Sequence, residues 1–314
     1  MIIFDDPERF AQLEQNCVAT IGKFDGVHLG HQLILDQLKR KAEDLEIPSL
    51  VILLEPHPEE FFAGESGNCP ARLTVFREKL ELLESFGIDY VFELKFDETL
   101  AKVSPEAYVD DILVGGLGIQ AFIVGNDFRF GHERRGDFAL LQQKAQEHGF
   151  EVLETFPYER NGQRISSTFI REELAKDNFP LVEQILGRPF SMKGEVEQGQ
   201  QIGTDIGFPT CNINPHRRAI PLHGVYACEV RMVDRYYPAA VNIGYRPTVT
   251  EDGEALLEAH ILDFAEDLYG KTIEVIFRHK IRDEQKFADL EELKAQISAD
   301  VEQVRAHFEL ATTE

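Results

Sequence analysis

The first half of the chain alternates short apolar runs with amphipathic stretches, and this alternation limits the possible folds more than any other feature. The apolar runs predict buried strands at 17–22, 49–55, 88–94, 121–125 and 150–156. Between them, apolar residues at helical spacing predict helices that begin near Leu29, near Thr74, at Ser104 and at Phe138. Apolar strands that alternate with helices are typical of a parallel sheet covered on both faces. We therefore expect a Rossmann-like α/β domain, which binds ligands at the carboxyl ends of its strands.

The second half has a different pattern. After residues 185–190, short extended segments separated by glycines predict closely spaced strands, which are typical of an antiparallel barrel or sandwich. One amphipathic stretch, at 290–308, predicts a C-terminal helix. A chain of 314 residues is long enough for two domains, which we set at 1–183 and 184–314.

Charge and composition exclude several classes of protein. The formal net charge of −24 argues against a nucleic-acid binder and against an anionic membrane surface, although one local pocket can still bind a small phosphorylated ligand. The four cysteines form no CxxC pair, so structural zinc and a disulfide framework are not expected. We find neither a signal-peptide pattern nor an apolar stretch of membrane-spanning length, and we expect a cytoplasmic protein.

The segment GKFDGVHLGH (22–31) places two histidines between a predicted strand and a predicted helix. His28 and His31 are three residues apart, so both lie at the helix N-terminus, where free backbone N–H groups attract phosphate. Gly30 lets a phosphate approach the backbone, and imidazoles add directional donors. This arrangement suits phosphoryl or nucleotidyl transfer. The alternative is that one histidine caps the helix and the other is solvated.

A second segment, RISSTFIREEL (164–174), predicts another helix start. Ser166, Ser167 or Thr168 can cap it, and Arg171 lies in its first turns. Hydroxyl groups and one arginine at a helix N-terminus favour an anion site, although such residues often act only as a cap.

Four blocks of the first half, in order, resemble the FMN adenylyltransferase module of the prokaryotic bifunctional riboflavin kinase/FAD synthetase family. They are GKFDGVHLGH, LEPHPEEFF (54–62), VGNDFRFGHERRGD (124–137) and ISSTFIR (165–171). The resemblance implies that His28 and His31 contact the ATP phosphates and stabilise the transition state, and that Arg171 is catalytic as well. It also implies an ATP- and phosphate-binding set made of Gly22, Phe24, Asp25, Gly30, Asp127, Ser167 and Thr168.

In the second half, IGFPTCNI (206–213) places Thr210 and Asn212 two residues apart. On a strand, both side chains point to one face. A hydroxyl and a carboxamide oxygen are hard neutral ligands that suit the Mg²⁺ carried by ATP. The alternative is a hydrogen-bonded pair at a strand edge.

The segment LLEAHIL (256–262) alternates like a strand with one buried face. Leu257, Ala259 and Ile261 fall on one face, and Glu258 and His260 on the other. A carboxylate on such a face is normally solvated. If the face lines a pocket, Glu258 can act as general base for a hydroxyl nucleophile.

These segments resemble the riboflavin kinase module of the same family, which is a small six-stranded antiparallel barrel. The matching runs are 187–203, 207–212, 223–227, 241–249, 257–264 and 268–287. The resemblance implies that Thr210 and Asn212 bind Mg-ATP and that Glu258 is the catalytic base. It also assigns Gly207, Pro209 and Arg282 to ATP or flavin binding. The chain has PTCN where the family usually has PTAN, and Thr204 where a basic residue is common.

The resulting hypothesis is a two-step enzyme that uses ATP and Mg²⁺. Riboflavin is first phosphorylated to FMN, and FMN is then adenylylated to FAD with release of pyrophosphate. Two alternatives are an FMN adenylyltransferase with a silent flavin-binding kinase module, and a flavin-binding protein without turnover. The expected partners are riboflavin, FMN and ATP, and the sequence makes no prediction of the oligomeric state.

Overall fold

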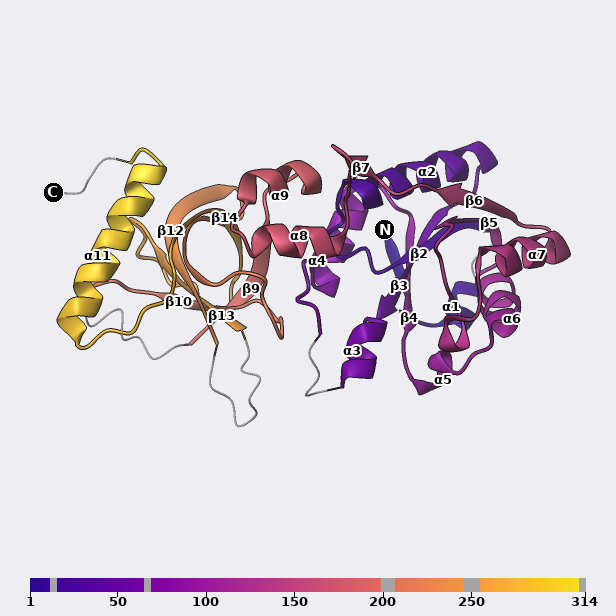
Figure 1. Ribbon diagram of the computed structural model, residues 1–314, viewed down its shortest axis with the longest axis horizontal. Helices are drawn as coiled ribbons and strands as arrows, with labels where there is room; N and C mark the ends of the chain where they lie inside the picture. The colour runs from indigo at the N-terminus through magenta and orange to yellow at the C-terminus, as the bar shows by residue number, and fades with distance from the viewer. Residues whose placement is uncertain (12–15, 65–68, 199–206, 246–254, 311–314) are drawn as a thin grey trace. The chain divides into compact units, whose positions relative to one another are not determined.

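A computed structural model describes residues 1–11, 16–64, 69–198, 207–245 and 255–310. The chain divides into two compact units (Figure 1). The first unit is Met1–Pro70 with Phe76–Ser166, and the second is Ala71–Val75 with Ser167–Glu314. This contact boundary differs from the predicted one, since residues 183 and 184 lie inside helix α9 (Phe179–Leu186). Contacts do not say which residues serve which activity, so the functional boundary stays a prediction.

The first unit contains a six-stranded parallel sheet in the order β1-β4-β3-β2-β5-β6. Its strands are β1 (Ile2–Phe4), β2 (Cys17–Gly22), β3 (Ser49–Glu55), β4 (Tyr90–Lys95), β5 (Ile119–Gly125) and β6 (Glu151–Thr155). Apolar residues are buried on both faces, since Val18 and Ala19, neighbours on β2, belong to different core clusters. The predicted parallel sheet with two covered faces is therefore confirmed.

Helices follow the strands of this sheet. They are α1 (Pro7–Ala11), α2 (Leu29–Leu45), α3 (Pro58–Ala63), α4 (Phe76–Ser85), α5 (Glu98–Ala101), α6 (Pro105–Ala107), the π-helix η1 (Tyr108–Gly116), the 3₁₀ turn η2 (His132–Arg134) and α7 (Phe138–His148). A two-stranded ribbon, β7 (Glu159–Arg160) and β8 (Gln163–Arg164), ends the unit.

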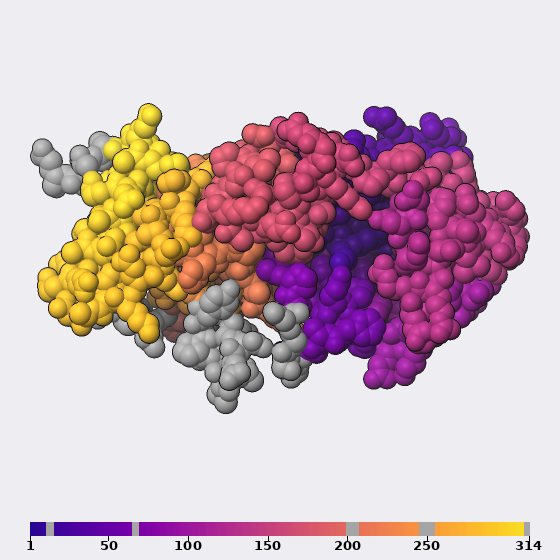
Figure 2. Space-filling view, viewed as in Figure 1, coloured from indigo at the N-terminus to yellow at the C-terminus, as the bar shows by residue number. Residues whose placement is uncertain are grey.

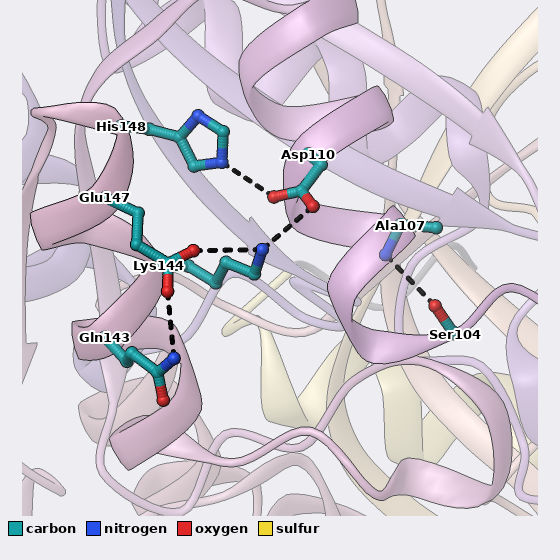
Figure 3. Close-up of polar contacts among 7 residues, drawn as sticks. All are labelled: Ser104, Ala107, Asp110, Gln143, Lys144, Glu147 and His148. Carbon is teal, nitrogen blue, oxygen red and sulfur yellow. Dashed lines mark hydrogen bonds and ion pairs between the residues drawn. The ribbon is translucent and has the colours of Figure 1, made fainter.

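Local sequence explains where several of these helices begin and end. Ser104 caps α6 with its hydroxyl, which accepts the N–H of Ala107 (Figure 3). Asp137 caps α7 in the same way, and the helix ends at Gly149, whose φ is 78°. The helix starts predicted at Ser104 and Phe138 are thus confirmed.

A polar network joins η1 to α7 (Figure 3). The carboxylate of Asp110 accepts hydrogen bonds from Lys144 Nζ at 2.9 Å and lies 2.7 Å from His148 Nε2. Lys144 also pairs with Glu147. Three residues of α7 are therefore tied directly or indirectly to one aspartate of η1.

Among its described residues, the second unit is a closed antiparallel barrel with two preceding helices and one C-terminal helix. The helices are α8 (Ser167–Leu174), α9 and α11 (Leu290–His307). The strand order around the barrel is β10-β13-β12-β11-β14-β9. These strands are β9 (Ser191–Glu197), β10 (Cys211–Asn214), β11 (Gly224–Met232), β12 (Arg235–Tyr245), β13 (Ala255–Ile261) and β14 (Thr272–Arg282). The predicted antiparallel six-stranded barrel and C-terminal helix are confirmed.

Helix α11 packs on the outside of the barrel through Val304, which is fully buried with Ala227, Ala240 and Leu262. In the space-filling view the yellow atoms of α11 lie directly against those of the barrel strands (Figure 2). Within the described ranges, no helix is both long enough and apolar enough to cross a membrane.

Candidate functional site

The two histidines lie at the carboxyl edge of the parallel sheet. Strand β2 ends at Gly22, and α2 begins at Leu29, directly after His28. The neighbouring strand β5 ends at Gly125, two residues before Asp127. Adjacent parallel strands end at the same edge, so the histidine segment and Asp127 both follow the carboxyl edge of the sheet, where open α/β sheets usually bind ligands.

The loop between β2 and α2 has an unusual backbone. Phe24, Gly26 and Val27 all have positive φ, at 46°, 85° and 40°. For residues with side chains this conformation is costly, and it persists only where the surroundings fix it. Phe24 is only 2% exposed and Val27 is fully buried. Both belong to the hydrophobic cluster that contains Val18 and Leu35, so packing in this cluster holds the loop in place. The loop leads directly to His28, the N-cap of α2.

His28 caps α2, and its ring stacks on that of His31. The Nδ1 atom of His28 accepts the backbone N–H of His31 at 3.3 Å. In a neutral imidazole whose Nδ1 accepts a hydrogen bond, the proton sits on Nε2, so Nε2 is a donor. The two ring centroids are 3.7 Å apart with an interplanar angle of 17°. A Cβ on Gly30 would lie 3.1 Å from Cε1 and Nδ1 of His28, so glycine makes room for this stack.

His31 is held in its neutral form. Burial lowers its pKa well below the usual 6.5, and the charges of His28, Lys79 and Lys23 lower it further. Its Nδ1 atom is buried and has no hydrogen-bond partner in the described part of the chain. The arrangement therefore offers a phosphate the neutral ring of His31, with the ring of His28 stacked on it, at a helix N-terminus.

Sequence reasoning missed two residues beside this pair. Lys79 is fully buried on α4, and its Nζ lies 3.2 Å from Nε2 of His57. His57 stands in the quoted block LEPHPEEFF, but Lys79 belongs to no motif and carries no signal in the sequence. A buried cation near His31 suits a site for a negatively charged substrate.

The other predicted residues of the first unit lie in or beside the same loop. Asp25 is buried at 2% exposure, and the ring of Phe24 lies 5.0 Å from that of His31. Asp127 is exposed and forms an ion pair with Arg164 at 3.0 Å. The nucleotide-binding role of Asp127 stays a prediction.

Ser167, Thr168 and Arg171 belong to the second unit. Helix α8 begins at Ser167, which agrees with the predicted helix start. Arg171 donates its Nε–H to the carbonyl oxygen of Ala71 at 2.5 Å. Since His28 and His31 belong to the first unit, joint action of both groups on one ATP stays a prediction.

In the barrel, three polar residues stand in one row across adjacent strands. Glu258 of β13 pairs directly with Asn212 of β10 and with Asn242 of β12. Directly opposed residues of a sheet point to the same face. Leu257, on the other face, is fully buried while Glu258 is exposed, which confirms the predicted alternation. The row places a carboxylate between two carboxamides.

Asn242, in the barrel, is a further residue that sequence reasoning missed. Its Nδ2 donates to Glu284 at 3.4 Å, and its Oδ1 is buried without a hydrogen-bond partner among the described residues. The quoted run VNIGYRPTV contains Asn242, but only the strand register brings it beside Glu258.

Thr210 differs from expectation. Strand β10 begins at Cys211, so Thr210 lies one residue before the strand, and the expectation that Thr210 and Asn212 both lie on it is wrong for Thr210. The cause is that the ladder between β10 and β13 ends at the pair Cys211–Ala259. Thr210 is exposed, as are Pro209 and Gly207, whose φ is 90°. Thr204 lies outside the described residues.

The donor set fits Mg²⁺ better than a softer metal. Thr210 and Asn212 offer neutral oxygens, which Mg²⁺ accepts together with the oxygens of ATP. Burial raises the pKa of the Cys211 thiol to about 11, so it stays protonated and does not compete as a ligand. Among the described residues, no group of three or more His, Cys, Asp or Glu could hold a metal ion on its own.

Arg282 has a structural partner. Its Nε lies 2.9 Å and 3.1 Å from the two carboxylate oxygens of Asp300, and its Nη2 lies 2.8 Å from Oδ2. Asp300 is 2% exposed and belongs to α11, so this bidentate pair fastens the helix to β14. A role of Arg282 in ligand binding stays a prediction.

Comparisons with known proteins match both units. The family model described as FAD synthetase matches residues 10–169, and the one described as riboflavin kinase matches residues 186–308. A bifunctional riboflavin kinase/FMN adenylyltransferase of Escherichia coli (strain K12) is 46% identical over 298 residues, which cover 95% of this chain and 94% of that protein. The protein of the same name from Pseudomonas fluorescens is 47% identical and covers 93% of each chain.

One solved structure has the same fold over nearly the whole length. It is titled as a macrolide-efflux protein from Streptococcus pneumoniae, with a TM-score of 0.78 and 27% identity, and it covers 97% of this chain and 98% of that one. The likeness supports the arrangement of strands and helices described above.

Proposed function

The chain belongs to the family of bifunctional riboflavin kinase/FMN adenylyltransferases, and on that premise we propose which residues carry each of its two reactions. The enzyme phosphorylates riboflavin to FMN with ATP, and it adenylylates FMN to FAD. The observation that carries the residue assignment is that each candidate reactive group, the histidine pair and Glu258, lies within the part matched by one family model.

For adenylyl transfer, we assign the first site to the phosphates of ATP. An oxygen of the FMN phosphate attacks the α-phosphorus, the bond to the bridging oxygen breaks, and pyrophosphate leaves. His28 donates from Nε2, and the N-terminus of α2 and His31 bind the oxygens on which negative charge grows. Gly22, Phe24, Asp25 and Gly30 shape this loop, and we also assign Asp127, Ser167, Thr168 and Arg171 to nucleotide binding in this reaction.

For the kinase reaction, we assign Glu258 as general base. Its carboxylate takes the proton of the riboflavin 5′-hydroxyl while that oxygen attacks the γ-phosphorus of ATP, and ADP leaves. Thr210 and Asn212 would hold Mg²⁺, which offsets phosphate charge when bound. Gly207, Pro209 and Arg282 complete the proposed set, which we place in the domain 184–314, while 1–183 carries adenylyl transfer. A cytoplasmic location belongs to this proposal, because both reactions consume ATP.

The test is a time course with purified protein, riboflavin, ATP and Mg²⁺, in which the flavins are separated by chromatography. We expect FMN first and FAD later. FMN alone would contradict the role given to His28 and His31. FAD from added FMN, but no product from riboflavin, would contradict the role given to Glu258. Omission of Mg²⁺, with EDTA present, should stop both steps.

A further inference from the structure

His260 lies on β13 two residues after Glu258, on the same face of the strand. Its ring is half-buried and makes two contacts with the segment that precedes β10. Nδ1 lies 2.8 Å from the carbonyl oxygen of Pro209, and the edge of the ring meets that of Phe208 at a centroid distance of 5.5 Å and an angle of 81°. His260 has no role in the reactions proposed above.

The hydrogen bond has a defined direction. A carbonyl oxygen only accepts, so Nδ1 of His260 carries the proton and donates it. Pro209 has no backbone N–H, so its carbonyl oxygen is the one backbone group of this residue that can form a strong hydrogen bond. The bond therefore fixes the peptide that joins Pro209 to Thr210.

The hydrogen bond between His260 and Pro209 lies just beyond the end of the ladder between β10 and β13. Asn212 and Glu258 are paired residues of β10 and β13, so the ladder sets the distance between them. Thr210 lies outside the strand, beyond the last pair, Cys211–Ala259. The next position on β13 after Ala259 is His260. Its side chain binds the segment before β10 at the point where the backbone pairing of β10 with β13 ends.

We propose that His260 is a positioning residue of the kinase reaction, which fixes Thr210 relative to Asn212 and Glu258 by bracing the Phe208–Pro209 segment. The inference rests on the proposed function of the second unit. His260 acts through Thr210, and so on the placement of Mg-ATP, rather than on riboflavin. Small displacements of a substrate-positioning group cost about 10- to 100-fold in rate.

The test compares two amides that differ in reach. In His260→Asn, the amide nitrogen takes the place of Nδ1 and can still donate to Pro209. In His260→Gln, the amide nitrogen takes the place of Nε2 and misses the carbonyl. We expect kcat/KM for ATP in the kinase reaction to fall about 10-fold or more in His260→Gln and at most about threefold in His260→Asn. The KM for riboflavin should change little in both.

Two controls separate this inference from simple destabilisation. His279→Gln changes another histidine of the barrel, on β14, which stacks on His307; its kinase parameters should stay at the wild-type level. Adenylylation of added FMN should be unchanged in all variants, and their melting temperatures should agree within a few degrees.

Three outcomes would overturn the proposal: equal losses of kcat/KM for ATP in His260→Asn and His260→Gln, no such loss in His260→Gln, or an effect confined to the KM for riboflavin. A wild-type protein that makes no FMN from riboflavin would instead contradict the proposed function itself. The two failures are therefore distinguishable in one set of assays.

Discussion

His28 and His31 lie at the start of helix α2 in the first unit, directly after a loop with positive φ angles, whereas Glu258 lies on the exposed face of a barrel strand in the second. At the first site, burial and neighbouring cations keep His31 neutral, and a helix N-terminus supplies donors. At the second, strand register sets a carboxylate between two carboxamides. Burial and nearby charges thus set the protonation state of His31 at the first site. Strand register sets which side chains lie next to Glu258 at the second. The predictions below test this difference, from the largest expected effect to the smallest.

The largest effect is expected at the base of the second site. Glu258→Gln keeps the shape of the side chain but removes the proton acceptor, so FMN formation from riboflavin should fall about 100- to 10,000-fold. Rates are measured by chromatography of FMN at saturating ATP. Adenylylation of added FMN is the control and should keep its wild-type rate. Equal loss of both activities in a folded variant would show that the sites are not independent.

The mirror experiment changes the first site. His28→Ala removes the Nε2 donor and the cap of α2, so adenylylation of FMN should fall about 100- to 1,000-fold. FAD formation from added FMN is the readout, and FMN formation from riboflavin should persist. A variant that still makes FAD at the wild-type rate would refute the phosphate-binding role of this histidine.

A smaller effect is expected from crowding the stacked histidines. In Gly30→Ala the new methyl group would lie 3.1 Å from the His28 ring and 3.3 Å from Cβ of Tyr158. Either the ring or its neighbour must shift, so adenylylation should fall about 10-fold, while the kinase rate stays unchanged. Comparison of kcat/KM for FMN in the variant and the wild type checks this. An unchanged value would mean that the stack does not need a glycine.

The environment of His31 also predicts a pH dependence of stability. Its folded pKa is lowered, so below the usual 6.5 the unfolded chain binds a proton that the folded protein resists. The stability that depends on neutral His31 is therefore present above that pH and is lost as the pH falls below it. Between about pH 7.5 and about pH 5.5, the melting temperature should fall more steeply in the wild type than in His31→Asn. Parallel curves would contradict this electrostatic account.

The smallest effect is expected from a change in the polar network around Asp110 (Figure 3). Its residues are distant in sequence from the histidine pair and from Glu258. The hydrogen bond from Lys144, followed by that from His148, lowers the pKa of Asp110 below its usual 3.8. Its contribution to stability is present above that pH and is lost as the pH falls through the lowered value. Asp110→Asn should lower the melting temperature slightly at neutral pH, because exposed pairs contribute little, and leave both activities intact. A loss of adenylylation would show that η1 matters for catalysis.

Much of the fold was predictable because its signals are local. A run of adjacent apolar residues indicates a buried strand such as 49–55, and a single polar residue before a helix indicates a cap such as Ser104 or Asp137. The three-residue strand β1 and the π-helix η1 were not foreseen, because a short edge strand and a change of helical hydrogen bonding leave no distinct periodicity. The motif residues were found for the same reason as the strands: each lies in a short continuous block.

The residues that sequence reasoning missed depend on contacts between distant segments. Lys79 meets His57 across 22 positions, and Asn242 meets Glu258 only through the register of β12 and β13. Arg282 illustrates the converse, since its bidentate bond to Asp300 was invisible in the motif that nominated it. No local pattern distinguishes a guanidinium that binds a ligand from one that binds a helix.

The sequence by itself determined the two-part architecture, the parallel sheet, the barrel and the blocks that carry the histidine pair, Thr210, Asn212 and Glu258. Only the tertiary structure decided that His28 and His31 stack, that His31 is neutral, that Thr210 stands outside the ladder, and that His260 holds the peptide before it. The physical reason is the separation along the chain over which each interaction acts. Periodicity and capping act over a few residues along the chain, whereas burial, pKa and register arise where residues far apart in sequence are packed together.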